Sequence, residues 1–176
     1  PEVMHQYMAK MSFRIDSTVT VYRPRHRDAR EAYHLNIYWK GAWVLHMLRY
    51  VMGDSAFFEA LREFNTHPLY RYRSATSADF QSVCEEIYGG DLSWFFLPWI
   101  YRPGWPKIRV NAVPKGRQLT VDIVDTCYDR NAFRMPVDLR VETTAGIEMR
   151  RVWAVPGSTR VVLRFEHRVI RAEPVG

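Results

Sequence analysis

The sequence has 176 residues, of which 47% are hydrophobic and 14% aromatic. That length suits one domain or two small ones, and that composition excludes an intrinsically disordered chain. No apolar run approaches the ~18–20 residues that cross a bilayer, and no signal-peptide pattern opens the chain. Because the chain starts at Pro1 without a methionine, we expect it to be a piece of a longer protein, and its localisation stays open.

The net charge of +6 comes from 25 Lys and Arg residues against 19 Asp and Glu residues. Most of the positive charge is arginine, in three short groups: Arg23, Arg25, Arg27 and Arg30; Arg71 and Arg73; Arg150 and Arg151. A nucleic-acid or membrane-surface patch is one interpretation. The other is a solvated surface, or a face that contacts another part of the protein. No nucleic-acid module signature accompanies the charge, so we predict no nucleic-acid partner.

The periodicity of the sequence changes near residues 103–106, which read PGWP. Apolar residues recur at helical spacing before this point and alternate with polar residues after it. We therefore predict an α+β protein with a helical domain over residues 1–104 and a small antiparallel β-sandwich over residues 105–176. At the start of the chain, we expect the tail of a helix over residues 1–16, extended or looped chain over 17–26, and a helical turn over 28–33.

Four helical segments are expected in the rest of the first domain. The first runs from about Ile37 to Met52, with Asn36 as its N-cap and Gly53 as its stop. Asp54 is expected to cap the next helix, which ends before Pro68. The third and fourth helical segments are expected to begin at residues 76 and 91. A capping box between Thr76 and Asp79 starts the third helix, and the glycines at 89–90 end it. Asp91 caps a short fourth segment, which Pro98 should kink or shorten.

The second domain shows alternating apolar residues between turn signals. The alternation is clearest over residues 108–110, 119–123, 137–141 and 161–165. Turn residues stand at 114–116, 129–131, 145–146 and 156–158. Six or seven short strands in this arrangement favour a small β-sandwich.

No self-contained active site emerges from the residues alone. The 6 histidines are scattered, and no H-E-x-x-H pair, G-x-S-x-G elbow, glycine-rich phosphate loop or Cys/His zinc cluster occurs. Glu85 and Glu86 are adjacent, so on a helix they point about 100° apart and make no facing pair. The 2 cysteines, Cys84 and Cys127, are most simply buried small hydrophobes, with a disulfide between them left open.

The order of several short motifs resembles the gluzincin zinc aminopeptidases, the family of aminopeptidase N and leukotriene hydrolase. Residues 37–49 read IYWKGAWVLHMLR, similar to the family's Y-x-K-G-x-x-x-L-x-x-L helix. The resemblance continues through GDSAFF at 53–58, the helix start at Thr76, and GDL at 90–92. It ends on PGWP at 103–106, similar to the family's P-G-x-P. Pro98 departs from the family, which carries a helix-compatible residue there.

The resemblance implies the end of a thermolysin-like catalytic domain followed by a β-sandwich. It also implies a peptide substrate, zinc in the full-length parent, and a tyrosine that reaches the zinc centre; the matching position here is Tyr38. The family's zinc ligands, general-base glutamate and amino-terminus-binding loop lie upstream and have no counterpart in this chain. We therefore expect the parent to hydrolyse N-terminal residues from peptides, and this chain alone to bind no metal or cofactor and to be inactive.

The chemistry of a phenol agrees with the role that the resemblance gives Tyr38. Zinc polarises the carbonyl and activates a water, so the tetrahedral intermediate carries a developing oxyanion. A phenol is neutral at pH 7 and donates one hydrogen bond, because its ordinary pKa is about 10. A position at a helix N-terminus adds a positive local potential that favours the negative charge of the oxyanion. Lys40, Gly41 and Trp43 are assigned to packing, with Gly41 allowing a close approach of a neighbouring element.

Two other interpretations stay open. Tyr38 can be simply an aromatic residue at a helix start, and the parent can be a non-catalytic peptide- or protein-binding scaffold of the same family. An upstream H-E-x-x-H with a downstream glutamate would favour the enzyme, and its absence would favour the scaffold.

Overall fold

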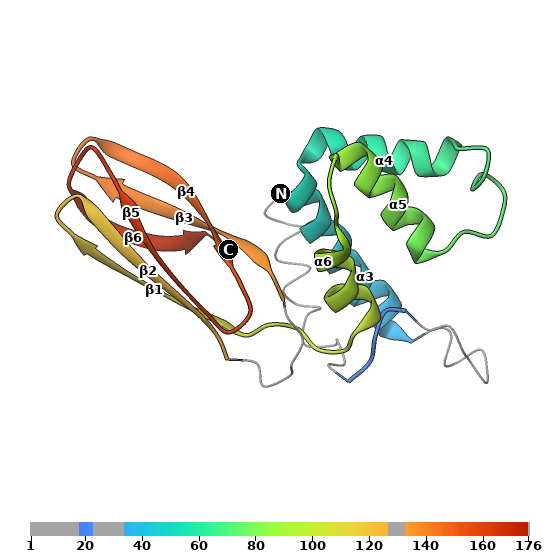
Figure 1. Ribbon diagram of the computed structural model, residues 1–176, viewed down its shortest axis with the longest axis horizontal. Coiled ribbons are helices and arrows are strands. Elements are labelled where there is room, and N and C mark those ends of the chain that lie inside the picture. Colours follow the sequence, from blue (N-terminus) through green and yellow to red (C-terminus); the bar gives the residue numbers. More distant parts are fainter. Residues whose placement is uncertain (1–17, 23–33, 127–132, 176) are drawn as a thin grey trace. The chain divides into compact units, whose positions relative to one another are not determined.

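The computed structural model describes residues 18–22, 34–126 and 133–175. The chain folds into two compact units, Pro1–Gly104 and Trp105–Gly176, the first helical and the second built from strands (Figure 1). This confirms the α+β fold class. That the two units are separate domains stays a prediction. The helix expected over residues 1–16, the helical turn over 28–33, Cys127 and the turn over 129–131 lie outside the described residues.

The helical unit contains α3 (Leu35–Met52), α4 (Asp54–Thr66), α5 (Ser77–Tyr88), α6 (Ser93–Phe96) and the π-helical turn η1 (Leu97–Tyr101). Helix α4 packs against both α3 and α5, and η1 packs against α3. The core of this unit is formed by apolar side chains from all five elements, among them Leu48, Phe57, Cys84, Phe95 and Ile100. No helix within the described residues is long and apolar enough to span a membrane.

Helix α3 begins two residues earlier than the sequence predicts. His34 is its N-cap, and the imidazole Nδ1 accepts a hydrogen bond from the Asn36 N–H at 3.2 Å. The prediction that Asn36 caps the helix is therefore wrong: Asn36 lies inside the first turn, fully buried, and its side-chain amide donates to the Val19 carbonyl at 3.0 Å. Asn36 already lies inside the helix, with its side chain turned toward Val19, so the capping position falls to His34.

A single residue, Gly53, connects α3 to α4. Its φ of +82° suits glycine, and its N–H donates to the Arg49 carbonyl at the end of α3. Asp54 does not cap α4 as predicted; it forms a bidentate pair with the Arg49 guanidinium, with N–O distances of 2.8 and 2.7 Å. The Arg49 guanidinium thus occupies the carboxylate that would otherwise accept from the first turn of α4.

The ends of α5 follow the prediction. The Thr76 hydroxyl accepts from the Asp79 N–H, while the Asp79 carboxylate accepts from the Thr76 N–H, which completes the capping box. Gly89 ends the helix in the left-handed conformation, with φ +73° and ψ 29°. Both predictions are confirmed.

Pro98 shortens α6 as predicted. The α-helical part ends at Phe96, and a π-helical turn continues to Tyr101. Proline has no N–H for an i→i−4 bond and its ring crowds the preceding turn, so the chain cannot continue as a regular α-helix there. Asp91 precedes the segment, and its carboxylate accepts from the Ser93 N–H at 3.1 Å, but Leu92 rather than Asp91 is the N-cap.

The second unit is a sandwich of two antiparallel three-stranded sheets, with strand orders β1-β2-β5 and β4-β3-β6. The strands are β1 (Ile108–Lys115), β2 (Gln118–Asp125), β3 (Met135–Thr143), β4 (Gly146–Ala154), β5 (Ser158–Arg164) and β6 (Val169–Val175). Alternate residues of the central strands β2 and β3 form the core between the sheets, including Val121, Ile123, Leu139 and Val141.

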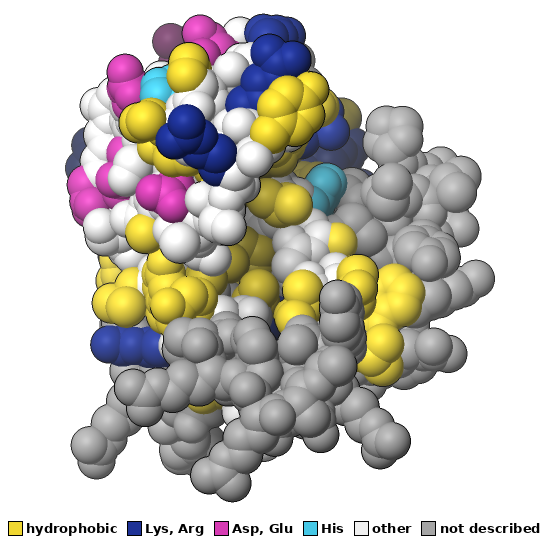
Figure 2. Space-filling model, turned by 90° about the vertical axis from the view of Figure 1, so that its right-hand side faces the viewer, with side chains coloured by type: hydrophobic (Ala, Val, Ile, Leu, Met, Phe, Trp, Pro, Cys, Tyr) yellow, Lys and Arg dark blue, Asp and Glu magenta, His cyan; other side chains and the backbone are white. Residues whose placement is uncertain are grey.

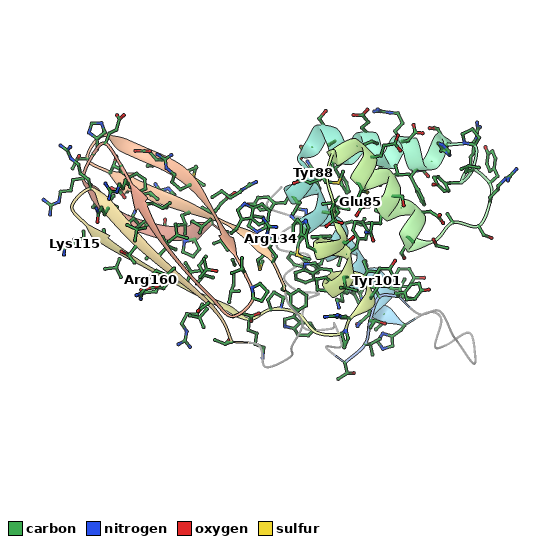
Figure 3. The ribbon with its side chains drawn as sticks, viewed as in Figure 1. Glu85, Tyr88, Tyr101, Lys115, Arg134 and Arg160 are labelled. Atoms are coloured by element: carbon green, nitrogen blue, oxygen red, sulfur yellow. The ribbon has the colours of Figure 1, made fainter. Side chains whose placement is uncertain are left out.

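Ion pairs on the sandwich join residues that face each other across adjacent strands. Asp122 pairs with Arg160, Asp138 with Arg151, Glu142 with Arg171, and Arg140 with Glu173. Each is also a direct partner in the strand register. Arg150 pairs with Glu148 on its own strand. These five arginines thus lie beside carboxylates, and Arg160 is labelled in Figure 3. Such exposed pairs each stabilise by only about 0.2–1 kcal/mol.

Candidate functional site

Tyr38 is the fourth residue of α3, one turn from its start. Its side chain is 57% exposed, and its hydroxyl makes no hydrogen bond to any residue in the described part of the chain. A tyrosine hydroxyl that is open on one side can donate to a molecule that approaches it. The structure therefore places Tyr38 on an accessible surface rather than inside the core of the unit.

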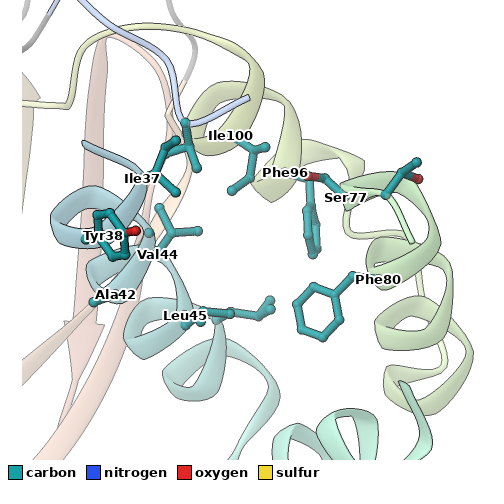
Figure 4. Close-up of a pocket in the computed structure, with 13 residues that line it drawn as sticks. Ile37, Tyr38, Ala42, Val44, Leu45, Ser77, Phe80, Phe96 and Ile100 are labelled. Atoms are coloured by element: carbon teal, nitrogen blue, oxygen red, sulfur yellow. The ribbon is translucent and has the colours of Figure 1, made fainter. Parts of the chain in front are cut away.

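A half-open cavity of about 530 Å³ adjoins Tyr38. Its lining is mainly apolar and comes from Val21, from exposed and buried residues of α3, from the start of α5, and from α6 and η1. Figure 4 shows Ile37 and Tyr38 on one side of the cavity, with Phe80 and Phe96 on the other. Leu45 and Ala42 continue the wall along α3. A phenol at the edge of an apolar recess is well placed to meet a bound group away from bulk water.

An apolar stripe runs along the exposed face of α3. Leu35 is 53% exposed and Leu45 41% exposed, and these residues flank Tyr38 and Ala42 at helical spacing. Figure 2 shows hydrophobic side chains gathered on the face of the helical unit that is turned to the viewer, with most of the charged side chains above them. A helix that is apolar on its exposed face as well as on its buried face is typical of one that other protein covers.

Gly41 lies on the same exposed side, one turn after Tyr38. A Cβ added there would meet no described atom within 4 Å. The predicted close approach of a neighbouring element to Gly41 is therefore wrong for the described residues. Gly41 instead lines the cavity and leaves open space beside the tyrosine.

Lys40 is a charged residue enclosed by the core of the helical unit. It is 3% exposed, and its ammonium donates to the Arg102 carbonyl at 3.1 Å. Burial lowers the pKa of Lys40 from 10.5 to about 8, because the protonated form loses its hydration. The sequence assigned Lys40 to packing; its burial agrees with that assignment, but its hydrogen bond was not foreseen.

Glu85 and Glu86 form no catalytic pair. The Glu85 carboxylate accepts from the Leu92 N–H at 2.9 Å and from the Gln81 amide at 2.8 Å, so it fixes the loop after α5. Glu86 is exposed. Figure 3 shows Glu85 with Tyr88 on α5. The role of Glu85 is structural.

Cys84 is a free, fully buried thiol, so the disulfide that the sequence left open is not formed in the structure. Burial, with the nearby Glu85 charge, raises the pKa of Cys84 to about 12. A thiol with so high a pKa is a poor nucleophile and a poor metal ligand at neutral pH.

No metal site is found among the residues that the structure describes. Their histidine, cysteine, aspartate and glutamate side chains form no group of three or more that could hold an ion. His34 and His67 each accept a backbone hydrogen bond, and His46 packs edge-on against Trp43. His5 and His26 lie outside the described residues. The described residues thus do not fit a zinc centre.

Comparisons with known proteins show which family this chain belongs to. Residues 2–99 match the family model described as the peptidase family M1 domain. The chain is 31% identical over 77 residues to aminopeptidase N of Lactococcus lactis, and 32% identical over 78 residues to leucyl aminopeptidase of Saccharolobus solfataricus. Each match covers 44% of this chain but only 9% and 10% of those relatives. The chain thus matches a small part of their length.

The fold also matches a solved structure. Aminopeptidase A of Legionella pneumophila, in complex with aspartic acid, superposes with a TM-score of 0.71 at 17% sequence identity. The superposition covers 87% of this chain and 18% of that one, and at this identity it speaks to the fold. The family model, in contrast, covers more than half of the 176 residues. The chain therefore belongs to peptidase family M1, the zinc-dependent metallo-aminopeptidases, as its sequence motifs indicate.

Proposed function

We propose that this chain is the distal part of the catalytic domain of a zinc aminopeptidase, together with the β-sandwich behind it. In this proposal the parent removes residues from the N-termini of peptides. The zinc ligands and the general base belong to parts of the parent outside this chain. Membership of the family and the small share of its relatives' length that the chain matches support this division.

Tyr38 has the role of oxyanion donor in this proposal. When water adds to the scissile carbonyl, its oxygen gains negative charge, and a fixed hydroxyl that donates to it stabilises the transition state more than the substrate. The observation that carries the assignment is the exposed phenol of Tyr38, without a hydrogen-bond partner among the described residues, at the edge of the cavity. Its place on the first turn of α3 adds the positive potential of the helix N-terminus.

The exposed apolar stripe of α3 supports the second half of the proposal. Leu35, Ala42 and Leu45 flank Tyr38 on the side that is open in this chain. Contact with the metal-bearing part of the parent would bury this stripe and bring the phenol into a shared cleft. Burial of apolar side chains at ~25 cal/mol per Å² would then hold the two parts together.

The test is a kinetic comparison in the full-length parent. Tyr38→Phe removes only the hydroxyl, and we expect kcat to fall about 10²- to 10³-fold with little change in KM. Tyr88→Phe is the matched control, because Tyr88 is also an exposed helical tyrosine. An unchanged kcat in the Tyr38→Phe enzyme would refute the proposed role.

A second arm of the test uses the 176-residue chain alone. We expect no hydrolysis of aminoacyl reporter substrates, with or without added zinc. Hydrolysis that a chelator abolishes would contradict the proposed division of the catalytic groups. If the full-length parent has no activity and still binds peptides, the scaffold interpretation replaces the enzyme.

A further inference from the structure

Two buried polar residues stand on the face of α3 opposite Tyr38. Asn36 is 0% exposed and Lys40 is 3% exposed. They are four residues apart, so they share one side of the helix, while Tyr38 is two residues from each and points about 200° away. The same buried row continues as Val44, Leu48 and Met52. The row thus changes from polar to apolar as it leaves the neighbourhood of Tyr38.

Both polar side chains donate to backbone carbonyls of other segments. The Asn36 amide donates to the Val19 carbonyl at 3.0 Å, and the Lys40 ammonium donates to the Arg102 carbonyl at 3.1 Å. Val19 lies in the irregular segment 18–22, and Arg102 is the C-cap of η1. The start of α3 is therefore tied at two points to chain that is 17 and 62 residues away.

The two acceptor segments are also tied to each other. The Tyr22 N–H donates to the Ile100 carbonyl at 3.0 Å, and the Tyr22 and Tyr101 rings meet edge-on with centroids 4.9 Å apart. The Thr20 hydroxyl donates to the Tyr22 carbonyl at 2.6 Å. Segment 18–22 and the end of η1 thus form one support, to which both Asn36 and Lys40 are bonded.

Apolar burial alone would not need these groups. Hydrophobic packing is non-directional, so the row from Val44 to Met52 can bury α3 over a range of small rotations and shifts. A hydrogen bond is directional and has a narrow range of lengths, and its partly buried carbonyl loses that partner if the donor moves away. Two such bonds, one on each side of residue 38 in sequence, fix the rotation and the height of the first turns of the helix.

We propose that Asn36 and Lys40 are positioning residues, a two-point clamp that fixes the orientation of the Tyr38 side chain through the first turns of α3. The effect of the clamp on catalysis rests on the proposed oxyanion role of Tyr38. Its effect on the orientation of the Tyr38 side chain does not depend on that role. A hydroxyl displaced by about 1 Å from a reacting group can lose on the order of 10²-fold in rate. The clamp acts through the helix, since neither side chain faces the cavity.

The structural test uses the 176-residue chain with 3-fluorotyrosine at position 38 only, followed by ¹⁹F NMR. We expect one sharp resonance in the parent chain. Asn36→Leu and Lys40→Met each keep similar volume but remove the donor, and both should shift, broaden or split the resonance, more so in the double variant. Lys40→Arg keeps a cationic donor and should restore a single resonance close to that of the parent chain.

Two exposed positions on α4 serve as matched controls. Asn65→Leu and Arg62→Met make the same kinds of change on the surface of the helical unit, and both should leave the Tyr38 resonance unchanged. Slow amide exchange at Val83 in α5 shows that each variant is folded. If Lys40→Met does not fold, Lys40→Leu, which also removes the donor, replaces it. An unchanged Tyr38 resonance in folded Asn36→Leu and Lys40→Met (or Lys40→Leu) variants would overturn the clamp.

Kinetics of the full-length parent separate this proposal from the proposed function. The clamp predicts that Asn36→Leu and Lys40→Met lower kcat about 10- to 100-fold at nearly constant KM. If Tyr38→Phe leaves kcat unchanged, the oxyanion role fails, whereas the NMR result still decides the clamp. If Tyr38→Phe lowers kcat and the clamp variants do not, the clamp alone fails.

Discussion

At the scale of single residues, Lys40 is the least expected feature of the helical unit. A lysine is rarely enclosed without a carboxylate, because its charged form loses hydration. Here the ammonium has a carbonyl as its partner, and desolvation is the cause that lowers its pKa to about 8. The residue therefore costs stability at neutral pH, which is consistent with a role beyond packing.

The lowered pKa predicts how stability changes with pH. Unfolded Lys40 holds its proton up to about pH 10.5, while folded Lys40 releases it near pH 8, so the unfolded state binds more protons between these values. The free energy of unfolding of the chain should therefore rise across this window, by about 2 kcal/mol from pH 7.5 to pH 9.5. Lys40→Met removes this titration.

Urea unfolding of the two proteins at several pH values measures the difference between them. The raised pKa of Cys84 lowers the free energy of unfolding as pH rises from about 9 toward 12. This effect is the same in both proteins, so it cancels in the difference between them. The advantage of Lys40→Met over the parent chain should shrink steadily from pH 7.5 to pH 9.5. A difference that does not depend on pH would show that Lys40 titrates normally.

At the scale of elements, the sequence predicted those helices and strands whose local signals agree with their tertiary use. The capping box at Thr76, the glycine stop at 89 and the break at Pro98 act through the backbone nearby, so they were found from the sequence alone. The caps predicted at Asn36 and Asp54 were wrong because each residue lies inside its helix, where the Asn36 amide donates to the distant Val19 carbonyl and Asp54 pairs with Arg49.

The sandwich shows the same limit. Alternation revealed β2 and β3, which lie in the middle of their sheets and bury every second residue. Strand β6 buries only its first residue, Val169, and β4 only Val152 and Ala154 at its end, so their patterns are weak. Six strands in two sheets agree with the predicted number, but β4 and β6 were not identified individually.

Gly41 allows a prediction about α3 as an element. Glycine inside a helix costs about 0.8–1 kcal/mol relative to alanine, and here an added Cβ meets nothing within 4 Å in the described residues. Gly41→Ala should therefore stabilise the 176-residue chain by up to about 1 kcal/mol, seen in urea unfolding. In the full-length parent the same change should lower kcat, because the methyl group fills space beside Tyr38. If Gly41→Ala stabilises the 176-residue chain and leaves the full-length parent fully active, the proposed shared cleft at this face is contradicted.

At the scale of the whole molecule, each unit has a packed core, but α3 exposes an apolar stripe. Beside this stripe, the phenol of Tyr38 has no hydrogen bond to the described residues. The proposed function accounts for both through one surface of α3 that a larger catalytic domain would cover. Tyr38 became the candidate through the order of motifs, since nothing in its own composition or spacing marks it, and its catalytic role stays a proposal. The clamp beneath it depends on contacts over 17 and 62 residues, which no local pattern reveals.

The most direct measurement compares how two ligands bind the full-length parent and its Tyr38→Phe variant. A phosphinic peptide mimics the tetrahedral intermediate and carries the oxyanion, while the free amino acid product does not. If the phenol of Tyr38 donates to the oxyanion, calorimetry will show the variant binding the phosphinic peptide about 100-fold more weakly, with the affinity for the amino acid nearly unchanged. Equal losses for both ligands, or no loss for either, would contradict the role assigned to Tyr38.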